Sequence, residues 1–164
     1  AMNPCPCGFL GHPTKACTCT EAAIHRYRDK ISGPILDRID LHVEVQNVDF
    51  NQLADKTKAE SSSEIRRRVN RARKLQEKRF AGTGVTCNAK MPPQMTKDFC
   101  VLTAEAEALL KISFDKLGLS ARAYDKILRI SRTIADLENS EEINSAHVSE
   151  ALQYRALDRK YWNR

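Results

Sequence analysis

Four cysteines lie within fifteen residues near the start of the chain, spaced as two C-x-C pairs. They are Cys5, Cys7, Cys17 and Cys19. Clustered thiols in a reducing compartment bind metal or do chemistry more often than they form disulfides. Gly8 and Gly11 let the intervening chain turn back, so the four thiolates can close a tetrahedral zinc site, in which His12 can replace one ligand. The alternative is a group of reduced, partly buried thiols.

Arg122 stands at about the second position of a predicted helix, which Ser120 begins as N-cap in the stretch GLSARAYDKILR. A cation there faces the positive end of the helix dipole, at a cost of about 0.3 to 1 kcal/mol. A bound phosphate would turn that cost into a gain, because free N–H groups at a helix start already favour anions. The alternative is an ion pair with Asp125.

Arg38 follows a short turn that begins with Gly-Pro, and it directly precedes the apolar-alternating stretch IDLHVEV. An arginine at the end of a rigid element is how a neighbouring subunit can reach the γ-phosphate of a nucleotide. The alternative is a salt bridge to Asp37 or Asp40, which flank it.

Helical patterns dominate the chain, and they must position these groups. We expect a short helix capped by Thr20, a single turn after Pro34, and helices that begin near residues 61, 103, 120 and 144. In the helix after Ser120, Tyr124 and Ile127 are predicted to face inward. Residues 81–95, with two glycines and two prolines, are predicted to form a loop. The predicted fold class is mainly α.

One or two strands are predicted: one over residues 39–45, where apolar and polar residues alternate, and the tail of another in the first residues, AMN. Because a strand needs partners for its backbone groups, we expect the segment 39–45 to be the remnant of an α/β core that lies upstream. The predicted divisions are 1–48 for the end of that core, 49–100 for a connecting segment and 101–164 for a helical lid.

The predicted helix after Ser61 is strongly basic. Ser61 and Glu64 form a capping box, and an apolar stripe runs along one side. The basic residues of this helix are Arg66, Arg67, Arg68, Arg71, Arg73, Lys74, Lys78 and Arg79. Such a face is either simply solvated or binds nucleic-acid phosphates with a steep dependence on salt.

Composition limits the function classes. The 164 residues carry 27 Lys and Arg against 21 Asp and Glu, and the net charge of +6 favours anionic partners. Neither a membrane span nor a signal-peptide pattern is present, which indicates a cytoplasmic protein. A P-loop, H-E-x-x-H and G-x-S-x-G are all missing from the sequence, and the four histidines show no paired spacing. We therefore expect this chain to catalyse nothing by itself.

Several separated motifs together resemble the C-terminal part of the magnesium-chelatase-like AAA+ ATPases of the ComM (YifB) type. The motifs, in order, are NPCPCG, CTCT, ISGPILDRIDLHVEV, GLSARAYDKILRISRTIADL and AHVSEALQYRALDR. The resemblance implies a ring, expected to be a hexamer, that uses ATP and Mg²⁺, with the P-loop and metal-holding acids upstream. It also implies a cysteine-rich insertion, which favours zinc.

The resemblance assigns roles to three residues. Asn3 is similar to sensor 1, Arg38 resembles the arginine finger that acts on the adjacent subunit, and Arg122 resembles the sensor-2 arginine of the lid. It further suggests work on DNA, as a helicase or in branch migration during recombination. The alternatives are a helical DNA-binding module with no ATPase role, and a chelatase-type subunit that inserts metal into a tetrapyrrole.

Overall fold

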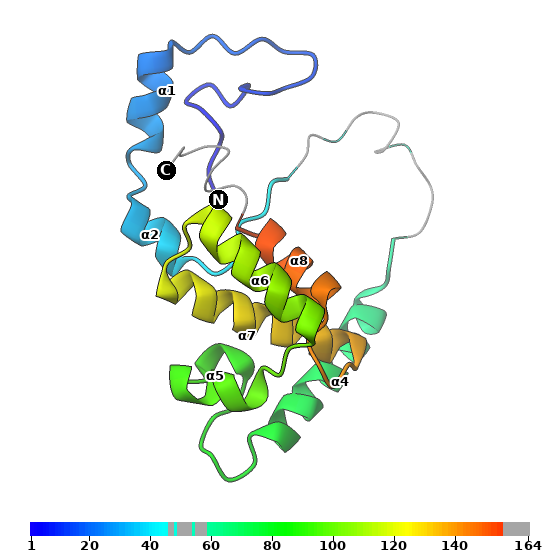
Figure 1. The fold of residues 1–164 in the computed structure, drawn as a ribbon. Helices are drawn as coiled ribbons and strands as arrows, with labels where there is room; N and C mark the ends of the chain where they lie inside the picture. The colour runs from blue at the N-terminus through cyan, green and yellow to red at the C-terminus, as the bar shows by residue number, and fades with distance from the viewer. Residues whose placement is uncertain (46–47, 49–53, 55–58, 156–164) are drawn as a thin grey trace. The chain divides into compact units, whose positions relative to one another are not determined.

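Helices make up nearly all the regular structure of the chain (Figure 1). The computed structural model describes residues 1–45, 48, 54 and 59–155. The chain divides into two units: unit 1 is Ala1–Asp55 with Tyr154–Arg164, and unit 2 is Lys56–Gln153. The predicted mainly-α fold class is confirmed. None of the helices in the described ranges is long and apolar enough to cross a membrane.

Unit 1 begins with the cysteine loop and continues into two short helices, α1 (Glu21–Arg28) and α2 (Gly33–Arg38). As predicted, Thr20 caps α1, and its hydroxyl accepts a hydrogen bond from the Ala23 N–H at 3.3 Å. The Arg28 Nε donates to the Pro4 carbonyl at 3.4 Å, which ties α1 to the cysteine loop. Pro34 lies in the first turn of α2, where a missing N–H costs nothing.

The predicted strand over residues 39–45 is wrong for the described structure, in which this segment is extended but forms no β-ladder. Its His42 N–H donates to the Tyr154 carbonyl at 2.9 Å. The alternating apolar side chains remain exposed, from 41% at Ile39 to 87% at Val45. Alternation describes one face of a strand, but a ladder also needs a neighbouring backbone, and the described residues supply none.

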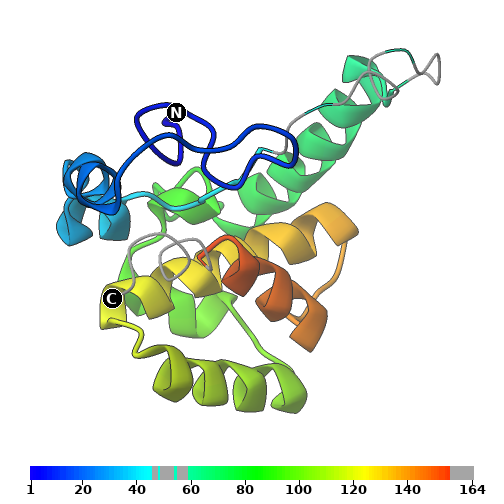
Figure 2. The same cartoon turned by 90° about the horizontal axis from the view of Figure 1, so that it is seen from above.

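Unit 2 is a helical bundle arranged around α7. Its elements are α4 (Ser62–Arg79), the 3₁₀ turn η1 (Asn88–Lys90), α5 (Pro93–Phe99), α6 (Ala104–Leu117), α7 (Ala121–Glu138) and α8 (Ser145–Gln153). Helix α7 packs against α4, α5, α8 and η1, and Figure 2 shows it running through the middle of these elements. Its inward side includes Ile127 and Leu128, both buried, as the helical periodicity predicts.

The predicted helix ends of unit 2 are confirmed. Ser61 and Glu64 form the capping box of α4, with the Glu64 carboxylate accepting from the Ser61 N–H at 3.0 Å. Gly118 ends α6 in the left-handed conformation at φ 52°. Ser120 caps α7, and its hydroxyl accepts from the Ala123 N–H at 3.1 Å. Asn144 caps α8 through bonds from the N–H groups of Ala146 and His147.

Two local predictions in unit 2 are wrong. The predicted loop over 81–95 contains η1 and the start of α5, because Pro93 favours a first helical turn as readily as it favours a loop. Tyr124 is 37% exposed and does not face fully inward; it packs edge-on against Phe114, with ring centroids 6.0 Å apart. A phenol can keep its hydroxyl in water while the ring is partly covered.

A buried ionic network fixes α4 to α7. The Asp136 carboxylate is fully buried and accepts from Arg79 Nη1 and from Asn88 Nδ2, both at 2.8 Å. Arg132, 1% exposed, donates its Nε to the same carboxylate at 3.2 Å and its Nη1 to the Glu141 carbonyl at 2.6 Å. Burial alone would raise the pKa of Asp136, but the bonds from Arg79 and Asn88 hold that pKa below its ordinary value.

Candidate functional site

The four clustered cysteines converge on one point in unit 1. Their sulfur atoms all lie within 4.8 Å of one another. The Sγ–Sγ distances are 3.4 Å for Cys5–Cys7, 3.7 Å for Cys5–Cys17 and 3.6 Å for Cys7–Cys17. A tetrahedral zinc site with Zn–S bonds of about 2.3 Å has sulfur–sulfur edges of about 3.8 Å. The three edges among Cys5, Cys7 and Cys17 are close to this value, and the edges to Cys19 are no longer than 4.8 Å, so the four sulfurs are near enough to share one ion.

The backbone around the cysteines supports this arrangement. Gly8 has φ of 80°, and its N–H donates to the Cys5 carbonyl at 3.0 Å, so the first C-x-C pair lies within a tight turn that Gly8 closes. Cys5 is fully buried, whereas the other three are partly exposed. A closed structural metal site needs such turns, because both cysteine pairs must face one ion.

Thiol ionisation in the cluster is uneven. N–H bonds from Phe9 and Thr18 lower the pKa of Cys7 to about 5. At Cys17, the Cys19 N–H favours the thiolate, but burial and the neighbouring sulfurs outweigh it and raise the pKa to about 12. Several thiolates held together repel one another, and a bound cation would remove that repulsion.

His12 lies outside the group of possible metal ligands that the described residues form. Its Nδ1 accepts from the N–H of Thr14 at 3.2 Å and from the N–H of Lys15 at 3.1 Å. The imidazole therefore organises the loop between the two C-x-C pairs. Its ring also packs edge-on against Phe9, with centroids 5.6 Å apart.

Arg38 is the last residue of α2 and is exposed. Asp37, one of the two predicted ion-pair partners of Arg38, is instead bonded to Arg155. The Arg155 Nη2 lies 3.3 Å from Asp37 Oδ1. Arg155 also donates Nη1 to the Ile39 carbonyl at 2.9 Å. Within the described residues, the Arg38 guanidinium has no ion-pair partner, so it extends from a helix end that a second arginine holds in place.

Arg155 is a residue that the sequence reasoning missed. It is 6% exposed and joins the end of unit 1 to the α2 terminus. The sequence around Arg155 does not indicate its partner, because Asp37 lies 118 positions away in the chain. The adjacent motif AHVSEALQYRALDR contains this residue, and only its presence in that motif could have drawn attention to it.

Arg122 is the second residue of α7, as predicted, and it is exposed. The first turn of α7 contains no acidic residue. Asp125, the predicted alternative ion-pair partner of Arg122, is instead bonded to Arg129 one turn later. In the described part of the chain, Arg122 therefore has no ion-pair partner, and it lies beside the unpaired N–H groups that begin an eighteen-residue helix.

Asn3 lies against the turn of the cysteine loop. A Cβ placed on Gly8 would lie 3.5 Å from Asn3 Nδ2, so the asparagine amide covers the glycine closely. Asn3, Arg38 and the cysteine cluster all belong to unit 1, whereas Arg122 belongs to unit 2. Each unit thus carries part of the predicted site.

The comparisons with known proteins divide the chain at nearly the same place as the two units. Residues 59–155 match the family model described as magnesium chelatase, subunit ChlI C-terminal, and residues 1–53 match the model of magnesium chelatase, subunit ChlI. The boundary between the two matches falls beside the division of the units after Asp55.

Among curated relatives, the chain is 38% identical over 161 residues to competence protein ComM of Haemophilus influenzae. It is 37% identical to the uncharacterized protein YifB of Escherichia coli and 36% identical to that of Salmonella typhimurium. Each match covers 97% of this chain and 30% of the relative, so the chain spans under a third of the length of these proteins. The chain belongs to the magnesium chelatase subunit ChlI family and is similar to its ComM and YifB members.

Proposed function

We propose that this chain supplies the arginine finger and the sensor-2 lid of a ring-forming AAA+ ATPase that acts on DNA. In the whole protein, ATP and Mg²⁺ would be held by the preceding part of the chain, and this part would complete the nucleotide site. The observation that carries the proposal is that both candidate arginines are exposed at helix ends, while Asp37 and Asp125 beside them are bonded to other arginines.

For Arg38, the support is its setting at the C-terminus of α2. The bond between Arg155 and Asp37 leaves the finger candidate free to reach outward, and the same Arg155 anchors the Ile39 carbonyl that follows it. A guanidinium on a rigid end can meet the γ-phosphate of a neighbouring subunit without reorganisation, which is what a transition-state contact requires. We assign Asn3 to sensor 1 on its match to the family motif.

For Arg122, the support is electrostatic. An arginine at the start of α7 is unfavourable unless an anion is present, and the first turn of α7 holds no carboxylate to supply one. A nucleotide phosphate would interact with the guanidinium and with the helix N–H groups together. The lid would then respond to the bound nucleotide through the rigid helix α7.

We further infer that Cys5, Cys7, Cys17 and Cys19 hold a structural zinc ion. The near-tetrahedral edges of the sulfur cluster support this role. A four-thiolate site leaves no open coordination position, so the ion would stabilise the loop and take no part in hydrolysis. The loop carries Asn3 at its start, and zinc would therefore help to position that residue.

The test is ATP hydrolysis by the full-length enzyme with Arg38→Ala or Arg122→Ala. We expect Arg38→Ala to reduce kcat by about 10³-fold or more. Arg122→Ala should reduce kcat/KM by about 10- to 100-fold, as for the loss of a charge-assisted hydrogen bond. The matched control is Arg26→Ala, an exposed arginine of α1, which should leave turnover unchanged.

Mixed rings sharpen the assignment of Arg38. A subunit with a defective P-loop still carries Arg38, and an Arg38→Ala subunit still binds ATP, so mixing the two should restore part of the activity if Arg38 acts across an interface. Wild-type turnover from both single variants would remove the proposal and favour a helical DNA-binding module instead.

A further inference from the structure

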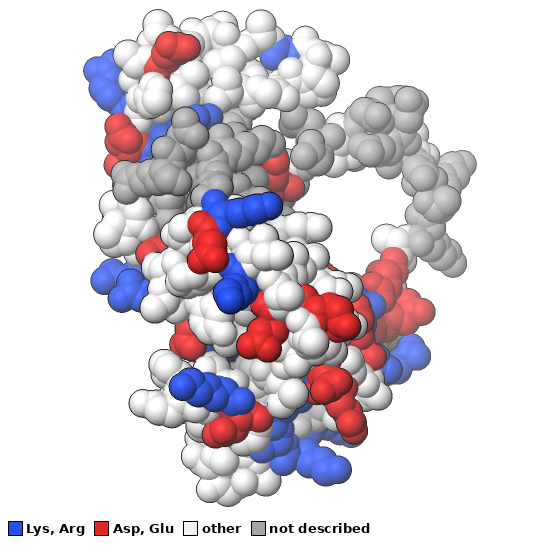
Figure 3. Space-filling view, in the orientation of Figure 1, with Lys and Arg blue, Asp and Glu red and all other residues white. Residues whose placement is uncertain are grey.

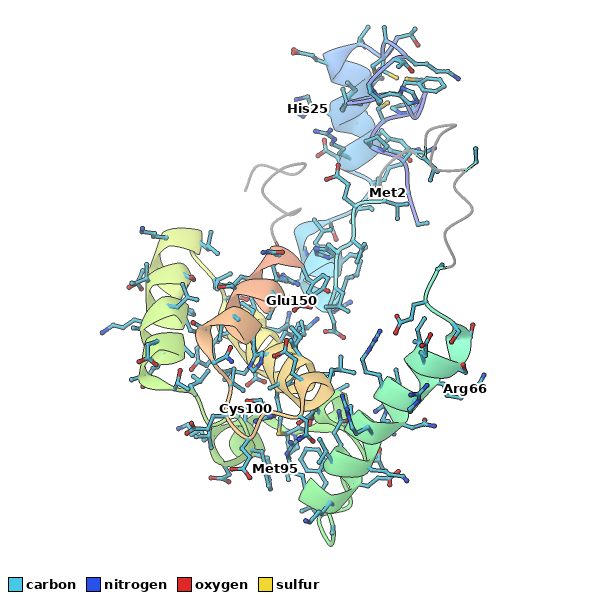
Figure 4. The ribbon with its side chains drawn as sticks, turned by 90° about the vertical axis from the view of Figure 1, so that its right-hand side faces the viewer. Met2, His25, Arg66, Met95, Cys100 and Glu150 are labelled. Atoms are coloured by element: carbon cyan, nitrogen blue, oxygen red, sulfur yellow. The ribbon has the colours of Figure 1, made fainter. Side chains whose placement is uncertain are left out.

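Helix α4 projects from the rest of unit 2 along much of its length (Figure 2). All of residues 61–71 are exposed, and the first buried side chain of the helix is Ala72, followed by Gln76. Figure 4 shows Arg66 on this projecting part. The capping box keeps this exposed half helical, although a solvated helix of this length is marginal without packing.

Six residues of α4 line one open hollow on the surface: Arg67, Asn70, Arg71, Lys74, Leu75 and Lys78. Their spacing of three, one, three, one and three residues places them on one helix face, which we call the basic stripe. At about 100° per residue, the cations of the stripe lie opposite Ala72 and Gln76, the side by which α4 packs.

Three cations of the stripe form no ion pair with a carboxylate of the described residues. Arg67, Lys74 and Lys78 have no ion-pair partner among the described residues, whereas Arg71 donates to the Leu137 carbonyl at 3.0 Å. On the other sides of α4, Arg66 has no ion-pair partner among the described residues, and Arg73 donates to Gln76 Oε1 at 3.4 Å. Arg68 pairs with Glu60, and Arg79 pairs with Asp136. Four cations of α4 make no ion pair or hydrogen bond among the described residues, and three of them, Arg67, Lys74 and Lys78, lie on the stripe.

This row of positive charge differs from the charge distribution on the face of the molecule shown in Figure 3. On the face shown in Figure 3, Lys and Arg are interspersed with Asp and Glu, with no continuous field of one sign. A mixed surface is the ordinary condition of a soluble protein and carries no partner information. A single-sign row on an exposed helix instead attracts a partner with a row of opposite charges.

The chemistry of the stripe favours nucleic acid over an acidic protein. It contains no aromatic residue, and its one apolar member, Leu75, is half-buried. Protein interfaces are enriched in aromatic anchors and depleted in lysine, whereas nucleic-acid interfaces are wet, polar and strongly positive. The exposed Ile65 and Val69 lie on the packing side of α4 and do not belong to the stripe.

The length of the stripe also suits a phosphate backbone. From residue 67 to residue 78 the helix rises about 16 Å, and the cations follow one another at intervals of about 4 to 6 Å. Phosphates along one strand of a duplex recur every 3.4 Å of axis, so the stripe spans about five of them. We propose that the basic stripe of α4 binds the phosphate backbone of nucleic acid, without reading its sequence.

This inference rests on the proposed DNA role but not on the roles of Arg38 and Arg122. Neither nucleotide nor ring assembly is needed for helix α4 to contact phosphates. Loss of the ATPase assignment would therefore leave the binding prediction intact, and loss of binding would leave the ATPase experiment unaffected.

The experiment measures binding of a fluorescent single-stranded oligonucleotide and of a duplex to the whole chain, by anisotropy, between about 50 and 200 mM salt. The test variant is Arg67→Gln, Lys74→Gln and Lys78→Gln combined. Because each phosphate contact contributes about 0.7 to the salt slope for a single strand, the slope should fall by about 2. The affinity at the lowest salt should fall at least tenfold.

The matched control removes the same charge elsewhere in unit 2, through Lys90→Gln, Lys97→Gln and Lys111→Gln, all exposed in the structure. It should retain the wild-type slope within about 0.5. Arg67→Lys with Lys74→Arg keeps the stripe charged and should bind like wild type. An equal loss in the control, or an unchanged slope in the test variant, would overturn the proposal. Displacement of the oligonucleotide by polyglutamate at equal charge concentration would indicate an acidic protein partner instead.

Discussion

The two units differ in what holds them together. Unit 2 buries an apolar core that includes Leu110, Ile127 and Val148, each 2% exposed or less. In unit 1, Cys5 and Leu36 are the buried apolar residues among those described. A unit with so little apolar burial needs another source of stability, and clustered metal ligands are one of the few available to a short segment. The difference teaches that unit 2 is organised by packing, whereas unit 1 depends on it much less, and its four clustered cysteines are the candidate stabiliser that we propose.

The two units also differ in how they treat charged groups and one apolar segment. Unit 1 leaves Leu41, Val43 and Val45 between 48% and 87% exposed along one extended segment. Unit 2 surrounds a fully buried carboxylate with two arginines and an asparagine, which is possible only inside a well-packed interior. Unit 2 thus buries a charged network inside an apolar core, whereas unit 1 leaves an extended apolar segment exposed.

Removal of metal should produce the largest difference between the units. Structural zinc in small thiolate sites supplies about 10 to 16 kcal/mol of apparent binding energy at neutral pH. We expect a strong chelator, or Cys5→Ser with Cys17→Ser, to abolish amide protection in the cysteine loop while unit 2 keeps its protection. Hydrogen exchange followed by mass spectrometry resolves the two units, and elemental analysis gives the zinc content.

The control for the cysteine variants is Cys87→Ser, because Cys87 belongs to unit 2 and is not one of the four clustered cysteines. It should retain about one zinc per chain. Less than about 0.2 zinc per wild-type chain purified without chelator would contradict the metal role and leave plain thiols.

Breaking the buried network should have the next largest effect, and it should be confined to unit 2. Asp136→Ala leaves Arg132 buried without its carboxylate, which we expect to cost about 3 to 5 kcal/mol of unfolding free energy. Asp125→Ala breaks the partly exposed pair with Arg129 on the same helix and should cost less than about 1 kcal/mol. Urea denaturation followed by helical circular dichroism measures both.

The same network predicts a pH dependence. Because the folded-state pKa of Asp136 lies below its ordinary value, its contribution is complete above about pH 4 and is lost as pH falls through the folded pKa. The acid limb of the stability curve should be shallower in Asp136→Asn than in wild type. Equal acid limbs would show that the carboxylate is not coupled to folding.

The smallest effect is expected from truncating an exposed residue of unit 1. Ile39→Ala removes a side chain that is 41% exposed and should change stability by less than about 0.5 kcal/mol. The matched change Ile127→Ala, at a fully buried position of α7, should cost about 2 to 5 kcal/mol. Similar losses from both, by urea denaturation of each variant, would mean that the segment after α2 is packed in solution.

Local rules predicted most of the helical structure. Ser61, Thr103 and Ser120 each begin a helix because a side-chain oxygen satisfies a free N–H, and this depends on a few adjacent residues. The strand over 39–45 was predicted on alternation and was wrong, because pairing depends on residues elsewhere in the chain. Tyr124 was assigned inward by periodicity, which does not specify how deeply a side chain is covered.

The candidate site was predictable in part. Cysteine spacing in the sequence predicted either a zinc site or a group of reduced thiols, and the structure brings the four sulfur atoms within 4.8 Å of one another. Arg38 and Arg122 were selected by position and by motif. Whether their neighbouring acids were available could not be predicted, since Asp37 is bonded to Arg155 from the far end of the chain.

By itself, the sequence determined where most of the helices begin, which residues can ligate a metal, and the motifs that place the chain in its family. These depend on neighbours within a few positions, where side chain and backbone meet regardless of the rest of the fold. Only the tertiary structure decided that Asp136 joins α4 to α7, that Arg155 leaves Arg38 unpaired, and that one face of α4 stays uncovered. Such contacts join residues distant in the chain, and their energies depend on burial that no local pattern encodes.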